Sequence, residues 1–159
     1  MIQEHLVQQA LSVEQIQSCY NVMRQLRPHL EEKLFVEGVK RQQIQGYQLA
    51  YLEIDGEVRA CAGFRILEFL AWGKVLYIDD LVTDSAMRKN GLASVLLKWV
   101  LEQGKAMQCD QVHLDSGPQR HDAHRLYLNH GFTIIGYHFA KEGEAVGKLL
   151  CPEKSKENG

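Results

Sequence analysis

The spacing of apolar residues divides the first third of the chain into extended and helical segments. Residues 2–9 are predicted to form a short opening strand. After Ser12, apolar residues recur every three or four positions up to Leu26, which predicts a helix with a serine cap. Pro28 interrupts this pattern, and a looser helical pattern covers residues 30–42. We therefore expect one strand followed by two helices.

The rest of the chain alternates between extended and helical patterns. Residues 47–67 contain two β-rich runs joined by Asp55-Gly56, a hairpin signal because these residue types tolerate positive φ. Gly73 opens a third run, residues 74–83, and a helix with one apolar face then extends to about Met107. Residues 111–116 predict a further strand. A helix at residues 120–130, ended by Gly131, and a last strand at residues 132–141 complete the pattern.

The predicted order is β-α-α-β-β-β-α-β-α-β, within one α/β domain at residues 1–141. The hairpin is antiparallel, and the strand-helix-strand units imply a locally parallel pair. We therefore expect a mixed, mostly antiparallel central sheet. Residues 142–159 are predicted to be a C-terminal tail with a disordered end, because the last eight residues are poor in apolar side chains.

Composition limits the classes of function. The length of 159 residues suits one domain, and the formal net charge of -2 argues against a broad nucleic-acid surface. No run of eighteen apolar residues occurs, and the first residues lack a basic segment followed by an apolar one. We expect a cytoplasmic protein without a membrane span. The four cysteines are scattered with no C-x-x-C pair, which favours reduced thiols over disulfides or a metal site.

The loop before the long helix is the first candidate site. Arg88, Lys89, Asn90, Gly91 and the small Ala93 stand where free backbone N–H groups and the positive end of a helix dipole point outward. The sequence contains neither G-x-x-x-x-G-K-[ST] nor G-x-G-x-x-G. Taken alone, this loop is either an ordinary helix start or an anion site.

Two motifs and the element order resemble the GNAT superfamily of acetyl-CoA-dependent N-acetyltransferases. Residues 88–93, RKNGLA, are similar to the family's Arg/Gln-x-x-Gly-x-Gly/Ala loop, and Ala123-x-x-x-Tyr127-x-x-x-Gly131-Phe132 is similar to its second signature. The resemblance spans nearly all of residues 1–141. It implies that the loop binds the coenzyme pyrophosphate through backbone amides.

The resemblance also implies further coenzyme contacts. The strand end "DLVT" is expected to diverge from its parallel neighbour at a bulge, so that Leu81 and Thr83 pair with the pantetheine arm and the Val82 amide polarises the acetyl carbonyl. Tyr127 is expected near the coenzyme sulfur, as the acid for the leaving thiolate. Arg120 departs from the family pattern, which commonly has asparagine there; it either contacts the phosphates or serves the helix start. The full set of expected coenzyme-binding residues is Leu81, Val82, Thr83, Arg88, Lys89, Asn90, Gly91, Leu92, Ala93, Ser94 and Arg120.

Candidate groups for the amine are acidic or imidazole side chains. Asp79 and Asp80 are adjacent in a strand, so they are expected on opposite faces, with one of them binding the amine and serving as a possible base. His113 and His138 are alternative bases. His121 and His124 lie three apart, but without a third ligand they do not predict a metal site.

The sequence therefore predicts an enzyme that transfers acetyl from acetyl-CoA directly to a primary amine, most simply of a small molecule, in a ternary complex. Two alternatives stay open: acetylation of a protein amino terminus or lysine, and an acyl-CoA-binding module without turnover. No cysteine lies within either motif, so no covalent intermediate is expected. A homodimer is implied by the resemblance alone.

Overall fold

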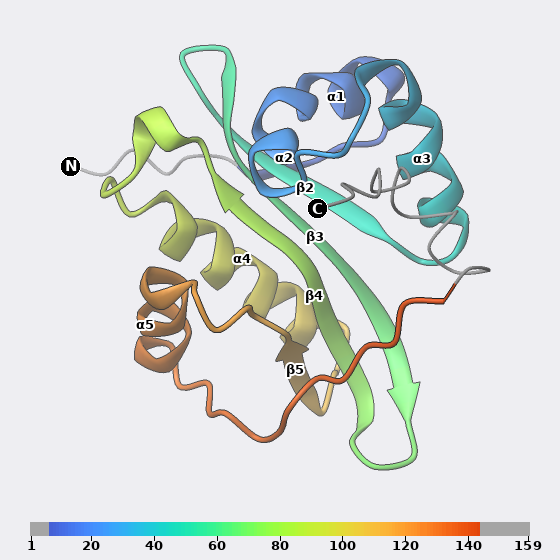
Figure 1. Cartoon of the computed structure of the whole chain (residues 1–159), viewed down its shortest axis with the longest axis vertical. Coiled ribbons are helices and arrows are strands. Elements are labelled where there is room, and N and C mark those ends of the chain that lie inside the picture. Colours follow the sequence, from blue (N-terminus) through green and yellow to red (C-terminus); the bar gives the residue numbers. More distant parts are fainter. Residues whose placement is uncertain (1–6, 144–159) are drawn as a thin grey trace, which may run out of the picture.

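The computed structural model describes residues 7–143, drawn in colour in Figure 1. Residues 1–6 and the end of the predicted tail lie outside this range. The elements in chain order are β1 (Val7–Gln9), α1 (Val13–Ser18), α2 (Tyr20–Leu26), α3 (Glu32–Ile44), β2 (Gln48–Ile54), β3 (Glu57–Phe69), β4 (Gly73–Thr83), the 3-10 turn η1 (Ser85–Met87), α4 (Leu92–Ala106), β5 (Gln111–Leu114) and α5 (His121–Asn129).

The five strands form one sheet in the order β1-β2-β3-β4-β5. The first four are antiparallel neighbours, and β4 and β5 are parallel. The β2–β3 turn is made by Asp55 and Gly56, both at positive φ (54° and 77°), as that residue pair predicts. The expected mixed, mostly antiparallel α/β sheet is confirmed.

Helices cover both faces of this sheet (Figure 1). The side chains of Leu49 and Tyr51 pack with residues of α1, α2 and α3 on what we call the α2 face. Their neighbours Ala50 and Leu52 pack with α4 on the opposite side, the α4 face. This division follows from the two-residue period of a strand. Leu126 and Tyr127 of α5 pack against the cluster on the α4 face.

The first predicted helix is divided into α1 and α2 at Cys19. The N–H of Cys19 donates to the carbonyl of Ile16 in a tight turn at 3.0 Å. The Ser18 hydroxyl (2.6 Å) and the Cys19 thiol (3.4 Å) both donate to the Gln15 carbonyl, the acceptor that the next helical N–H would use. Side-chain competition for one carbonyl is thus the local cause of the break.

Strand β4 carries a bulge at Asp79. In its pairing with β3, Gly63 lies opposite Asp80 and Phe64 lies opposite Ile78, which leaves Asp79 without a partner. The bulge changes which face each residue occupies: Ile78 packs on the α4 face, whereas Val82, four residues later, packs on the α2 face. A regular strand would have placed both on the same side.

The predicted last strand, residues 132–141, is not a strand in the structure. This segment continues from α5 and passes in front of β4 in the view of Figure 1. Its alternating apolar side chains are largely exposed, with Tyr137 at 90% and Phe139 at 91%. The pattern was suitable for a strand, but β5 is only four residues long and the segment forms no ladder with it. A strand exists only where its backbone groups find a partner.

Candidate active site

The sheet opens into a wedge between β4 and β5. Their pairing ends at Ile78 and Leu114, yet β4 continues for five further residues: the unpaired Asp79 of the bulge, and then residues 80–83, which pair with β3 alone. Within residues 7–143, no backbone hydrogen bond joins β4 to the chain after β5 beyond that point. We call this opening, between residues 79–83 and 115–117, the wedge. It is the divergence expected from "DLVT".

Two buried hydroxyls flank the wedge without a hydrogen-bond partner, Thr83 Oγ1 and Ser116 Oγ. An unsatisfied buried hydroxyl costs about 1–3 kcal/mol, so most such groups are paired in folded proteins. Thr83 is the last residue of β4 and Ser116 follows β5 by two positions, so the two residues come from the two sides of the wedge.

The loop before α4 offers free donors. Gly91 is the N-cap of α4 at φ 74°, and it supplies no side-chain cap. The first helical bond to it is from Val95 N–H at 3.1 Å, so the amides of Leu92, Ala93 and Ser94 have no acceptor among the described residues. A Cβ on Gly91 would meet nothing within 4 Å, so the space beside this N-cap residue is open. Helix termini with free amides of this kind are a common geometry for anion binding.

The side chains of the loop differ in whether they are free to contact a ligand. Arg88, Lys89 and Asn90 are exposed, and Asn90 donates to the Met87 carbonyl at 3.1 Å. The Ser94 hydroxyl lies 2.9 Å from His130 Nε2 at the end of α5, so it joins the two helices and leaves only its amide for a ligand.

Asp84 anchors this loop, a role that the sequence motifs did not reveal. Its carboxylate accepts from Arg59 (2.7 Å), from the Ala86 amide (3.2 Å) and from Gln25 of α2 (3.2 Å). The hydrogen bond from Arg59 is the main cause that lowers the pKa of Asp84, followed by the Ala86 amide. An aspartate before Ser85-Ala86 is a recognisable turn cap, but its two distant partners could not be read from spacing.

Tyr127 lies on α5, with its ring against Phe132 at a centroid distance of 5.9 Å. Burial raises the pKa of its phenol, while the charge of Arg120 opposes that shift. The phenol therefore stays protonated at neutral pH and can donate. No hydrogen bond to its hydroxyl is present within the described part of the chain. Arg120 precedes α5 and is exposed.

Asp79 and Asp80 lie on one face, and the expectation of opposite faces is wrong. Asp79 accepts a forked pair of bonds from Arg65, the closest at 2.5 Å. Asp80 accepts from Arg27 Nε at 3.0 Å, and the same guanidinium donates to the Asp79 carbonyl at 3.0 Å. The bulge is the reason, because its extra residue brings two consecutive side chains to the α2 face. Each carboxylate thus has its own arginine.

Tyr47 completes this cluster and was missed from the sequence. Its buried hydroxyl donates to Asp80 at 2.8 Å, and burial raises the pKa of the phenol, an effect to which Asp80 adds. Gly63 makes room for it, since a Cβ at that position would collide with the Tyr47 hydroxyl. A glycine inside a strand is the signal that could have found this close approach.

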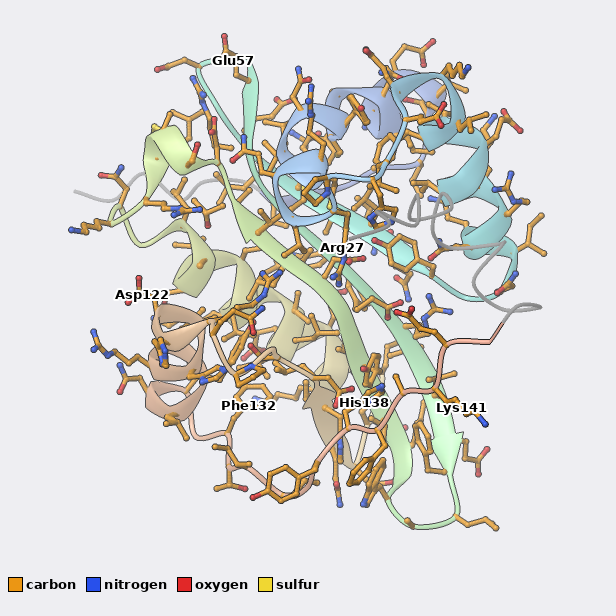
Figure 2. All side chains as sticks on the ribbon, in the orientation of Figure 1. Arg27, Glu57, Asp122, Phe132, His138 and Lys141 are labelled. Atoms are coloured by element: carbon orange, nitrogen blue, oxygen red, sulfur yellow. The ribbon has the colours of Figure 1, made fainter. Side chains whose placement is uncertain are left out.

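A second polar group lies at the mouth of the wedge. The Tyr77 hydroxyl donates to Asp115, and His138 Nδ1 lies 3.4 Å from Asp115 Oδ1. Figure 2 shows His138 on the segment that follows α5. The other candidate histidine, His113, is stacked on Trp72 at 4.1 Å between ring centroids.

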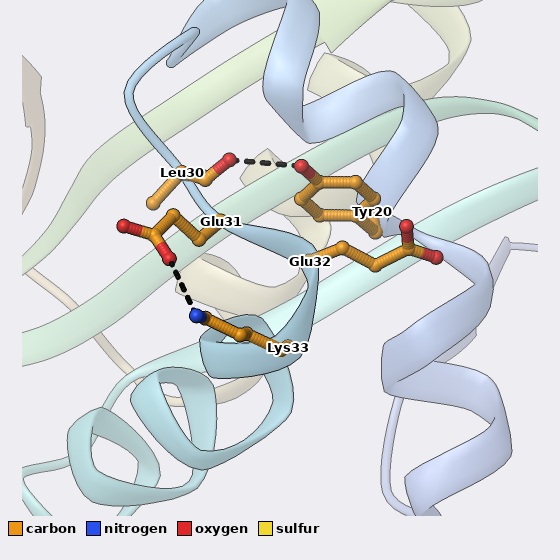
Figure 3. A pocket seen from close by; sticks show the side chains of 5 residues that line it. All are labelled: Tyr20, Leu30, Glu31, Glu32 and Lys33. Carbon is orange, nitrogen blue, oxygen red and sulfur yellow. Dashed lines mark hydrogen bonds and ion pairs between the residues drawn. The ribbon is translucent and has the colours of Figure 1, made fainter.

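No metal-binding group was found among the described residues. His121 and His124 have ring centroids 6.2 Å apart, and His124 Nε2 lies 2.8 Å from the Gly117 carbonyl, which occupies it structurally. A separate open hollow, shown in Figure 3, is lined by Tyr20, Leu30, Glu31, Glu32 and Lys33; none of these belongs to the wedge. No described helix is long and apolar enough to cross a membrane.

Comparison with known proteins agrees with this geometry. The model of the acetyltransferase (GNAT) family matches residues 11–132. An uncharacterised N-acetyltransferase of Bacillus subtilis, YhdJ, is 32% identical over 137 residues, covering 85% of this chain and 96% of its own. The aminoalkylphosphonate N-acetyltransferase of Salmonella typhimurium is 33% identical over 64 residues, covering 40% of this chain and 42% of its own.

The fold also has solved counterparts. AAC(6')-Iy, in complex with a bisubstrate analogue containing CoA, superposes with a TM-score of 0.74 at 16% identity, covering 87% of this chain and 97% of that one. The chain therefore belongs to the GNAT family, whose members use acetyl-CoA, and it is an acetyltransferase.

Proposed function

We propose that this enzyme transfers the acetyl group of acetyl-CoA to the primary amine of a small molecule by direct attack in a ternary complex. The observation that carries the proposal is the wedge itself. An unpaired strand edge, the unpaired hydroxyl of Thr83 and an uncapped helix terminus follow one another along β4 and into α4, and the unpaired hydroxyl of Ser116 lies after β5 on the other side of the wedge. This order suits a long ligand with amide groups at one end and phosphates at the other.

In this proposal the coenzyme is bound mainly by backbone. Leu81 and Thr83 pair with the pantetheine arm as a neighbouring strand would, and the Val82 amide polarises the acetyl carbonyl. The amides of residues 92–94 bind the pyrophosphate, with charge from Arg88 and Lys89. Asn90 and Gly91 shape that loop, and Arg120 adds charge at the start of α5.

Tyr127 is the proposed acid for the thiolate of coenzyme A. Its raised pKa supports this role, because a phenol that remains protonated has a proton to give. Asp79 and Asp80 are proposed as walls of the amine pocket. Their arginine partners argue that neither is free to attract a cation by net charge.

A small substrate is supported by the name of the Salmonella relative and by the ligand of AAC(6')-Iy, which contains an aminoglycoside fragment. Coenzyme binding is measured first, by calorimetric titration with acetyl-CoA. Thiol release is then followed with a panel comprising an aminoalkylphosphonate, an aminoglycoside, a polyamine and peptides with a free amino terminus. Faster release with the small amines supports the proposal. Release with the peptides alone, or binding without release, contradicts it.

Two features of the cellular setting are proposed from the sequence and the family. A cytoplasmic location agrees with the free thiols of Cys19, Cys61 and Cys109. A homodimer rests on the family resemblance, and sedimentation equilibrium tests it.

A further inference from the structure

Three carboxylates lie on the α2 face at or beside the wedge, and they differ in their partners. Asp79 and Asp80 each have an arginine within 3.0 Å, so their charges are neutralised. Asp115 has no arginine or lysine within ion-pair distance in the part of the chain that the structure describes. It is the one member of this trio that can support a positive charge forming beside it.

Asp115 contacts one imidazole, that of His138. The Tyr77 hydroxyl donates to one carboxylate oxygen, and His138 Nδ1 lies 3.4 Å from the other. Burial, then the hydrogen bond with Asp115, raises the pKa of Tyr77, so this phenol remains a donor. With the Nδ1 proton directed at Asp115, Nε2 of a neutral His138 is left as an acceptor.

We propose that His138 is the general base that removes the proton from the incoming amine, with Asp115 and Tyr77 as positioning residues. The assignment rests on the proposed function. Transfer from a lysine-like ammonium to an aspartate is uphill by about six pKa units, whereas an imidazole is far closer to neutrality. His138 also has a solvent route for the proton, because 66% of its side chain is exposed.

The proton inventory balances. The ammonium gives one proton to His138 Nε2, which passes it to solvent. The nitrogen lone pair then forms the N–C bond to the acetyl carbon, and the C–S bond breaks. The second proton leaves nitrogen for solvent, the thiolate takes one from Tyr127, and Tyr127 is reprotonated from solvent. One proton is released per turnover.

Other polar and charged groups lie near Asp115, Tyr77 and His138 and set the local electrostatic field. Asp79 raises and Arg27 lowers the pKa of Tyr77, so both act on the phenol that holds Asp115. His113, two residues before Asp115, has its Nε2 2.6 Å from the Gln111 side-chain oxygen. That contact and the stack on Trp72 give His113 a structural role. Because it was the other candidate base, a His113 variant is included in the test.

The test compares His138→Gln with His121→Gln, an exposed histidine on α5, using the panel amine that wild type acetylates fastest. His138→Gln should lower kcat/KM about a hundredfold at neutral pH, with acetyl-CoA affinity unchanged. His121→Gln should match wild type. The deficit of His138→Gln should shrink as pH approaches the pKa of the amine, because solvent then deprotonates the substrate.

A second arm separates catalysis from structure. With an amine that is neutral at the assay pH, His138→Gln should lose less than tenfold, since there is little proton to remove. Asp115→Asn should show the same dependence on amine basicity with a smaller loss. Equal losses for basic and neutral amines, full activity of His138→Gln, or a larger loss in His113→Gln would each overturn the assignment. A wild type that acetylates no panel amine would instead contradict the proposed function.

Discussion

The proposed coenzyme wall of the wedge and its proposed amine wall are built in different ways. The coenzyme wall, β4 beyond its bulge with the start of α4, offers mainly backbone groups supplied by one continuous stretch of chain. The proposed amine wall is made of side chains from the end of α2, the residue before β2, strands β3 and β4, and the segments after β5 and α5, and these side chains already contact one another in two groups. A backbone site suits a coenzyme that every member of the family shares. A side-chain site can vary with the acceptor.

The largest effect is expected when the proposed acid is removed. Tyr127→Phe should reduce kcat about a hundredfold if the phenol protonates the thiolate, while acetyl-CoA affinity changes little because the ring is kept. Steady-state kinetics with calorimetric titration measures both. Unaltered turnover would remove Tyr127 from the mechanism.

A change to the backbone itself should act on binding. Gly91→Val places a branched side chain at φ 74°, with strain of about 2 kcal/mol that the loop relieves by moving. Acetyl-CoA affinity should fall about thirtyfold. Gly56→Val is the matched control, since Gly56 has φ 77° and equally open surroundings in a turn outside the wedge. Equal affinity losses in both variants would contradict a specific role for Gly91.

The stabilisation that Asp84 gives to the loop before α4 should depend on pH. Because the pKa of Asp84 is lowered in the folded protein, its contribution is complete above the unfolded pKa of about 4 and is lost as pH falls through the folded value. Asp84→Asn should lower the free energy of unfolding by about 1 kcal/mol at pH 7. The gap between the two proteins should close in acid. Urea unfolding at pH 7 and pH 3 measures it, and a constant gap would rule out the ionised form as the anchor.

The smallest expected effect separates ligand groups from structural ones. Ser116→Ala should leave the free protein as stable as before or up to about 1 kcal/mol more so, because an unpaired buried hydroxyl is removed. Its acetyl-CoA affinity should fall about threefold. In Ser18→Ala the lost hydroxyl is already bonded, at 2.6 Å, so stability should drop and affinity should not. A destabilised Ser116→Ala protein would mean that the hydroxyl serves the fold.

The sequence predicted the two walls unequally for a physical reason. Gly91, Ala93 and Tyr127 are recognisable because a helix start and a helix face fix their surroundings locally. Tyr47, Arg27 and Arg65 were missed, since their partners lie 14 to 53 positions away in the chain. The prediction that Asp79 and Asp80 lie on opposite faces was wrong because alternation assumes a regular strand. The last strand was mispredicted because side-chain pattern cannot report whether a neighbour is available.

The bulge at Asp79 also sets the tolerance of β4 to changes in length. Upstream of it, Leu76 and Ile78 pack on the α4 face; downstream, Leu81 does so three positions later. Deleting Asp79 would make Ile78, Asp80 and Leu81 consecutive in regular alternation, so every other side chain would keep its present face and only the bulge would be lost. A deletion at a position of β4 away from the bulge would instead turn one half of the strand inside out. The strand can therefore lose a residue at the bulge more easily than anywhere else along its length.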